Sequence, residues 1–127
     1  MIYVYNRTKE THEGPNNYFI GRPSILGNPY THIKDKTTLA SYVVRTRDEA
    51  IELYDHYFDV MYSGNIEYQK LIDEIYEKYK NGVDVYLECY CAPLRCHGDI
   101  IKEKLQKRLI KERIKMYKQV WESIKML

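Results

Sequence analysis

The chain has 127 residues and a net charge of +2, with 20 Lys and Arg against 18 Asp and Glu. This length predicts one domain that can bury a core without disulfides, and the balanced charge does not favour nucleic acid as a partner. No signal peptide or membrane span is evident, and three cysteines in such a chain indicate a reducing compartment. We therefore expect a cytoplasmic protein, or one of the host cytoplasm if a phage encodes it.

Two short apolar runs, Ile2–Tyr5 and Tyr18–Ile20, predict the first strands. The second run leads into the segment GRPSILGNPY, residues 21–30, where two glycines and two prolines exclude regular structure. The backbone N–H groups of such a rigid loop, together with the fork of Arg22, suit a phosphate or a carboxylate. A further short strand is predicted within residues 39–44.

Two helices are predicted in the middle of the chain. Thr46 and Glu49 match a capping box that opens the first helix, and Gly64 ends it. Asn65 caps the second helix, which ends at residues 81–82. The apolar positions expected to face the core are Ala50, Ile51, Leu53, Tyr54, Tyr57, Phe58 and Met61 in the first helix, and Ile66, Leu71, Ile72, Ile75 and Tyr79 in the second.

All three cysteines lie in CYCAPLRCHGD, residues 89–99, between a predicted buried strand at residues 83–88 and a long helical pattern that starts at Ile100. In open α/β sheets, ligands usually bind where a strand ends and a helix begins. The order of elements predicts an α/β fold: a small, mainly parallel sheet of about four strands, packed helices and a long C-terminal helix.

The C-terminal segment contains no Gly or Pro from Ile100 to Leu127 and predicts a helix of roughly 40 Å, longer than this domain can cover. A heptad-like stripe with steps of four and three runs along it: Ile110, Ile114, Tyr117, Trp121 and Ile124. The stripe packs either on its own domain or on a partner subunit of a homo-oligomer. Lysines and arginines between residues 102 and 118 are interpreted as a solvated face. We divide the chain into an α/β domain, residues 1–109, and a helical extension, residues 110–127, which would form part of an assembly interface.

The two motifs together resemble an uncharacterised family of bacteria and phages, domain-of-unknown-function family 4326. Its hallmarks are GRPS-x-LGNP near the N-terminus and C-x-C-A-P-x-x-C-H-G-D near the C-terminus, and both stand here in that order. The intervening helix also matches, at residues 49–51 and Tyr54. The resemblance covers about residues 1–109, with Tyr90 where the family often has tryptophan. It implies a small α/β fold and leaves the activity open.

The cysteine stretch allows three interpretations. In the first, zinc or iron is bound by Cys89, Cys91, Cys96 and His97, which are suitable ligands. The spacing differs from paired C-x2-C knuckles, so three ligands and a fourth from elsewhere or from water are easier to build. In the second, the Gly21–Pro29 loop and the Cys91–Asp99 turn form a pocket without metal. In the third, the cysteines only pack as small apolar residues, and His97 and Asp99 only cap the helix.

The pocket interpretation predicts a nucleotide-like ligand, with its anionic group near the N-terminus of the helix that Asp99 caps. The ligand-binding residues would be Gly21, Arg22, Ser24, Gly27, Asn28, Tyr90, Arg95 and His97. In a phage, such a protein would sequester or modify a signalling nucleotide. The alternative hypothesis is a metal-binding structural or interaction protein that oligomerises through its C-terminal helix.

Whether the protein is an enzyme stays open, since no P-loop, nucleophile elbow or dinucleotide fingerprint is present. The candidate catalytic residues are Cys96, His97 and Asp99. Cys96 is expected to have a lowered pKa at a helix N-terminus, because positive potential favours the thiolate. Asp99 would act as a general base toward a ribose or water, or only as the helix cap.

Overall fold

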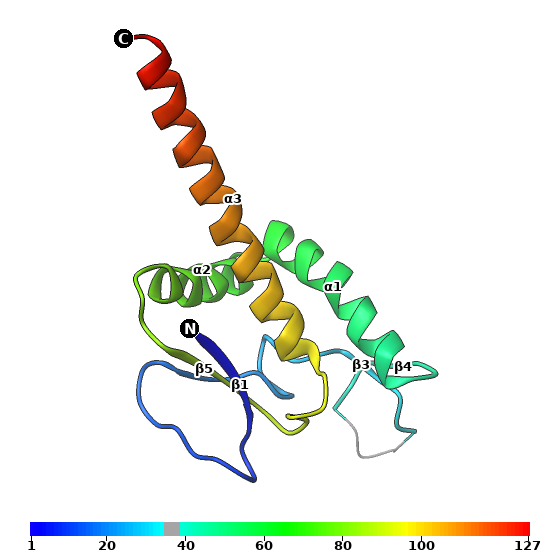
Figure 1. Cartoon of the computed structure of the whole chain (residues 1–127). Coiled ribbons are helices and arrows are strands. Elements are labelled where there is room, and N and C mark those ends of the chain that lie inside the picture. Colours follow the sequence, from blue (N-terminus) through cyan, green and yellow to red (C-terminus); the bar gives the residue numbers. More distant parts are fainter. Residues whose placement is uncertain (35–38) are drawn as a thin grey trace.

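The computed structural model describes residues 1–34 and 39–127, and the predicted α/β fold class is confirmed (Figure 1). The main sheet is parallel and has the strand order β1-β5-β2, with β1 at Ile2–Asn6, β5 at Val85–Cys89 and β2 at Asn17–Phe19. A separate parallel pair is formed by β3 (Tyr30–Thr31) and β4 (Tyr42–Val43). The helices of the described residues are α1 (Arg47–Gly64), α2 (Ile66–Lys80) and α3 (His97–Lys125). The expectation of about four strands in one sheet is wrong, because the two short later strands pair with each other.

The central strand β5 divides the interior into two layers. Val85, Leu87 and Cys89 alternate toward the buried face, where they join the helices in one apolar core. Tyr86 and Glu88 point to the opposite face, where the ring of His12 stacks on Tyr86 with 4.0 Å between centroids. The segment between β1 and β2 therefore covers the outer face of this small sheet.

The predicted caps of the first two helices are confirmed. Thr46 Oγ1 accepts the Glu49 N–H at 3.0 Å, and Asn65 Oδ1 accepts the Tyr68 N–H at 3.0 Å. Two predicted core positions are wrong: Leu53 is 36% exposed and Ile66 is 65% exposed. Ile66 lies nine residues before Ile75, which is about half a turn away around a helix of 3.6 residues per turn, so it faces solvent.

The long helix α3 begins at His97 rather than Ile100. Its N-cap is Cys96, whose sulfur accepts the Gly98 N–H at 3.3 Å, while the Asp99 carboxylate accepts the Cys96 N–H at 2.9 Å. The prediction that Asp99 is the N-cap is therefore wrong, since Asp99 is the third residue of the helix in a reciprocal capping box. Cysteine is not among the usual N-cap residues, so the sequence signal favoured the aspartate.

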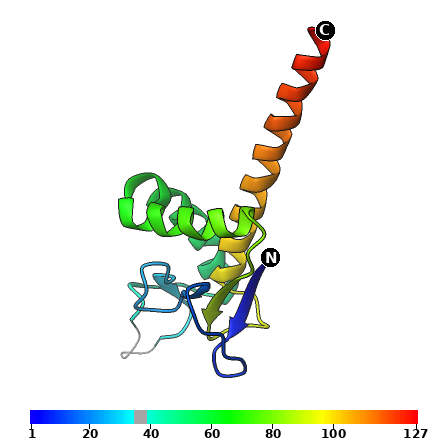
Figure 2. The same cartoon turned by 90° about the vertical axis from the view of Figure 1, so that its left-hand side faces the viewer.

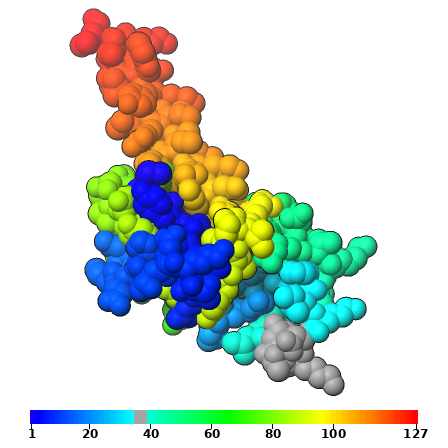
Figure 3. Space-filling view, turned by 60° about the horizontal axis from the view of Figure 1, so that its bottom comes forward, coloured from blue at the N-terminus to red at the C-terminus, as the bar shows by residue number. Residues whose placement is uncertain are grey.

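The C-terminal half of α3 stands away from the rest of the molecule (Figures 1 and 2). Leu109 is the last buried residue, and the space-filling view shows the following segment projecting from the domain (Figure 3). The stripe is exposed along its length: Ile110, Ile114, Tyr117, Trp121 and Ile124. The interpretation that this stripe packs on its own domain is therefore wrong. None of the described helices has both the length and the apolar character needed to cross a membrane.

Candidate functional site

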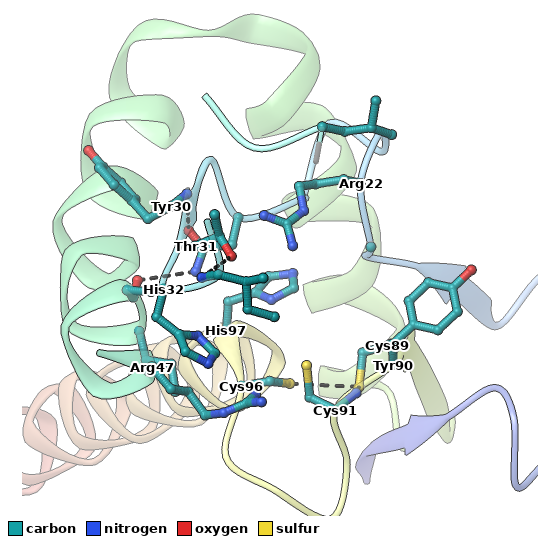
Figure 4. Close-up of a pocket in the computed structure, with 16 residues that line it drawn as sticks. Arg22, Tyr30, Thr31, His32, Arg47, Cys89, Tyr90, Cys91, Cys96 and His97 are labelled. Atoms are coloured by element: carbon teal, nitrogen blue, oxygen red, sulfur yellow. Dashed lines mark hydrogen bonds between the residues drawn. The ribbon is translucent and has the colours of Figure 1, made fainter. Parts of the chain in front are cut away.

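A hollow of about 300 Å³ lies at the carboxyl ends of β2 and β5. The two strands are parallel neighbours, and the Ile20 N–H continues their pairing with a hydrogen bond to the Glu88 carbonyl at 2.9 Å. The glycine-proline loop and the cysteine motif therefore leave the sheet at the same edge. Figure 4 shows side chains from both motifs around one space. This edge is where parallel sheets commonly bind ligands.

His97 joins the start of α3 to the end of β2 through a hydrogen bond. Its Nε2 lies 2.7 Å from the Ile20 carbonyl oxygen, and its ring meets the edge of Tyr54 at 4.9 Å. Burial lowers the pKa of His97 to about 4, so the imidazole is neutral near pH 7 and donates its Nε2–H to the carbonyl. The next residue, Gly98, allows this close approach, because an added Cβ would lie 2.7 Å from Ile20 Cδ1.

The three cysteine sulfurs form one cluster on a wall of the hollow. The Cys89 sulfur accepts the backbone N–H groups of Cys91 and Ala92, each at 3.4 Å, and lies 3.7 Å from the Cys96 sulfur. The Cys96 S–H donates to the Cys89 sulfur, and its single proton can turn instead to Cys91, so this thiol lowers the pKa of both neighbours. Its own pKa is raised, because deprotonation would remove these hydrogen bonds and bury a charge.

Cys91, rather than Cys96, is therefore the activated thiol, and the expected lowering of the Cys96 pKa is wrong. Both thiols border the hollow, but Cys91 is half-buried, whereas Cys96 is only 3% exposed. After the Cys96 S–H, the strongest favourable influence on the Cys91 thiolate is the guanidinium of Arg47, which donates a hydrogen bond to it. A partly open thiolate beside a cation is the arrangement that reactive cysteines use.

Arg22 brings an unsatisfied positive group to the same hollow. Its Nη1 is buried and has no hydrogen-bond partner among the described residues. Figure 4 shows the side chains of Arg22 and Arg47 entering the space from different sides. The loop folds closely over the stem of Arg22, since a Cβ added at Gly27 would lie 3.2 Å from Arg22 Cγ. A buried N–H group without an acceptor is costly, and an anion in the hollow would satisfy it.

The structure brings together only part of the predicted site. The predicted residues that line the hollow are Gly21, Arg22, Asn28, Cys89, Tyr90, Cys91, Cys96 and His97. The predicted residues outside it are Ser24, Gly27, Arg95 and Asp99. Ser24 Oγ instead accepts the Leu26 N–H, and Arg95 pairs with Glu52 at 3.1 Å on the surface.

The lining also includes residues that the sequence did not single out for binding: Tyr30, Thr31, His32, Ile33, Leu39, Arg47, Ala50 and Ile51. They come from β3, from the segments that follow it and from the first two turns of α1. No spacing in the sequence marks Arg47 for the pocket, because its place there depends on how the start of α1 packs beside the cysteine motif.

The four predicted metal ligands do not surround one point. His97 turns its Nε2 to the Ile20 carbonyl. Within residues 1–34 and 39–127, no three or more His, Cys, Asp or Glu side chains are arranged to hold a metal ion. The sulfur cluster is instead joined by its own hydrogen bonds and by that of Arg47.

A second hollow of about 580 Å³ lies between the three helices, and several of its charged groups are paired. Lys104 binds Asp59 at 3.1 Å, and Arg108 binds Asp73 at 2.8 Å. The unsatisfied guanidinium and the activated thiol both belong to the first hollow, which is therefore the better candidate for a functional site.

These features define an α/β protein with a thiol-lined pocket at the carboxyl edge of a small parallel sheet. The chain belongs to the family described as domain of unknown function DUF4326, whose model matches residues 4–107. Comparison with curated proteins and with solved structures finds no match. Both motifs and every lining residue of the pocket fall within the matched region, whereas the projecting half of α3 lies beyond it.

Proposed function

We propose that the pocket binds a small nucleotide-like molecule whose anionic group lies against Arg22. The observation that carries this proposal is the buried Nη1 of Arg22, which has no acceptor among the described residues. A phosphate oxygen would accept this N–H and offset the cost of burying the guanidinium. Arg47 adds a second positive charge to the same space.

The remaining lining supports an aromatic or heterocyclic portion of the ligand. Tyr90 is 56% exposed at the pocket, and Tyr30 adds a second ring. Asn28 and Thr31 contribute polar groups, and Ile33 contributes apolar surface. A mostly apolar lining with a few polar groups is usual for small-molecule sites, and the volume lies at the lower end of their range.

A ligand screen tests this proposal. AMP, ADP, ATP, the guanosine nucleotides, NAD and inorganic phosphate are added separately, and the melting temperature is measured. At 100 times its Kd, a bound compound stabilises the folded protein by about 2.7 kcal/mol, which raises Tm by several degrees. Arg22→Met keeps an aliphatic stem but removes the guanidinium, so it should abolish the shift.

Arg95→Met is the matched control, because Arg95 lies outside the pocket and pairs with Glu52 on the surface. It should keep the full shift. The proposal fails if no compound raises Tm, or if Arg22→Met responds as the wild type does. Product analysis of the stabilising compound after incubation then separates a binder that sequesters the nucleotide from an enzyme that modifies it.

We also propose that the projecting half of α3 pairs with the same segment of a second copy. The stripe spaced by four and three residues matches the seam of a coiled coil, and its side chains are exposed on a helix without support from its own domain. Trp121, which is 68% exposed, would lose the most apolar surface to the partner. A two-fold seam of this kind pairs one stripe with itself.

Light scattering on the full-length chain tests the pairing. The wild type should have the mass of two chains, and Ile114→Glu with Trp121→Glu should have the mass of one, because both charges would lie in the seam. Met116→Glu is the control, since Met116 is 50% exposed but lies off the stripe. A wild-type monomer at about 50 μM, a concentration that a Kd near 1 μM would saturate, contradicts the proposal.

A further inference from the structure

We propose that Cys91 and Cys96 form a reactive dithiol site that reduces a hydroperoxide and closes to a disulfide. This inference concerns the thiol wall of the pocket and does not require that a nucleotide binds. The three sulfurs of the cluster differ in exposure and in hydrogen bonding. All three cysteines border the pocket, but Cys91 is partly exposed, whereas Cys89 is 1% exposed and Cys96 is 3% exposed.

The sulfur that an oxidant can reach is the one that reacts first. A small hydroperoxide entering the pocket meets Cys91, whose thiolate is favoured by the Cys96 S–H and by Arg47. Cys89 is shielded and already accepts two backbone N–H groups. The attacking thiolate is therefore assigned to Cys91.

The first step transfers one oxygen. The Cys91 thiolate attacks the terminal, hydrogen-bearing oxygen of the hydroperoxide, so an S–O bond forms and the O–O bond breaks. Cys91 becomes a sulfenic acid, and the leaving alkoxide or hydroxide takes a proton from solvent. Negative charge moves to the leaving oxygen, and the guanidinium groups of Arg22 and Arg47 stand in the same space to stabilise it.

The second step closes the disulfide. Cys96 is the main influence that favours the Cys91 thiolate, and Figure 4 shows both side chains on the same wall of the hollow, within the sulfur cluster where Cys96 also lies 3.7 Å from Cys89. The Cys96 sulfur attacks the Cys91 sulfur, the S–S bond forms, the S–O bond breaks, and the hydroxyl leaves as water with the Cys96 proton. Over both steps, two thiols lose two electrons, and the hydroperoxide is reduced to an alcohol and water.

Closure would also change the pocket. The disulfide removes the Cys96 S–H donor from the cluster and the negative charge that faces Arg47. A purely structural cluster of buried thiols would not show this order of reaction, because none of its sulfurs would be both open and activated.

Mass spectrometry of the reduced, full-length protein treated with a small excess of hydrogen peroxide tests the site. We expect a loss of two hydrogens and a peptide map that joins Cys91 to Cys96. Cys96→Ser keeps a side-chain acceptor at the N-cap and should leave a Cys91 sulfenic acid that dimedone traps. Cys91→Ser should form no intramolecular disulfide.

Rates give a second readout. At pH 6, iodoacetamide should alkylate Cys91 about tenfold faster than the same cysteine in the unfolded chain, since a larger thiolate fraction outweighs its lower intrinsic nucleophilicity. The proposal is overturned by a wild-type map that joins Cys89 to Cys96, by an unoxidised wild type, or by a Cys91 rate no greater than in the unfolded chain. The map and the rate are both read on the wild type, so they hold even if a variant misfolds.

Discussion

Lowering the pH from 7 to 4 should remove about 3 kcal/mol of stability through His97 alone. The pKa of this buried imidazole is lowered from 6.5 to about 4, mainly by burial. Between these values the unfolded chain binds the proton and the folded chain does not, so stability falls as the pH falls. The gap, at about 1.36 kcal/mol for each pH unit, amounts to about 3 kcal/mol.

Urea unfolding at several pH values, on wild type and on His97→Gln, measures this effect. Glutamine keeps an N–H donor for the Ile20 carbonyl but cannot ionise in this range. A difference in unfolding free energy between the two proteins at pH 7 does not affect the test, because the test compares how each free energy changes with pH. The difference in unfolding free energy between the two proteins should shrink by about 3 kcal/mol from pH 7 to pH 4. Parallel curves would show that His97 is not held neutral by burial.

Replacing Tyr54 with phenylalanine should destabilise the fold by about 3 kcal/mol. The hydroxyls of Tyr54 and Tyr68 lie 2.8 Å apart in the core, and the Tyr54 hydroxyl also donates to the Leu26 carbonyl at 2.8 Å. A carbonyl can only accept, so Tyr54 gives its proton to Leu26 and receives the proton of Tyr68. Tyr54→Phe therefore leaves both a buried donor and a buried acceptor unpaired, at about 1–3 kcal/mol each.

The order of this hydrogen-bond chain predicts an asymmetry between the two tyrosines. Tyr68→Phe should cost less, because Tyr54 keeps its bond to Leu26. The double variant should be more stable than Tyr54→Phe alone, since the stranded Tyr68 donor is gone. Thermal or urea unfolding of the three variants gives all the values. An equal or larger cost for Tyr68→Phe would contradict this order of donors.

The local elements of this protein follow from short-range signals. Threonine and asparagine are favoured at helix N-caps, because their side chains accept a backbone N–H two or three residues ahead. Thr46 and Asn65 do so here, and the starts of α1 and α2 could therefore be predicted. The alternation around Leu87 marks a strand buried on one face. The meeting of the two motifs also followed, because neighbouring parallel strands end at the same edge of a sheet.

Which side chains line the pocket depends on packing between segments that are distant in the sequence. Arg47 reaches Cys91 only because the N-terminal end of α1 lies beside the cysteine turn, a contact that no spacing in the chain encodes. The same packing buries Cys96 and leaves Cys91 open, which reverses the roles that position at a helix N-terminus had suggested. Arg95 and Ser24 carry suitable groups but lie outside the hollow, since composition does not set the direction of a side chain.

The sequence by itself determined the family, the α/β class and the two motifs that border the pocket, because these rest on residue identity and on periodicity along the chain. Only the tertiary structure decided that Arg22 has a buried N–H with no acceptor among the described residues and that Cys91 is the partly exposed thiol. It also decided that His97 is a neutral imidazole hydrogen-bonded to the backbone. The physical reason is that burial, charge and hydrogen bonding at a site are set by neighbours distant in the chain.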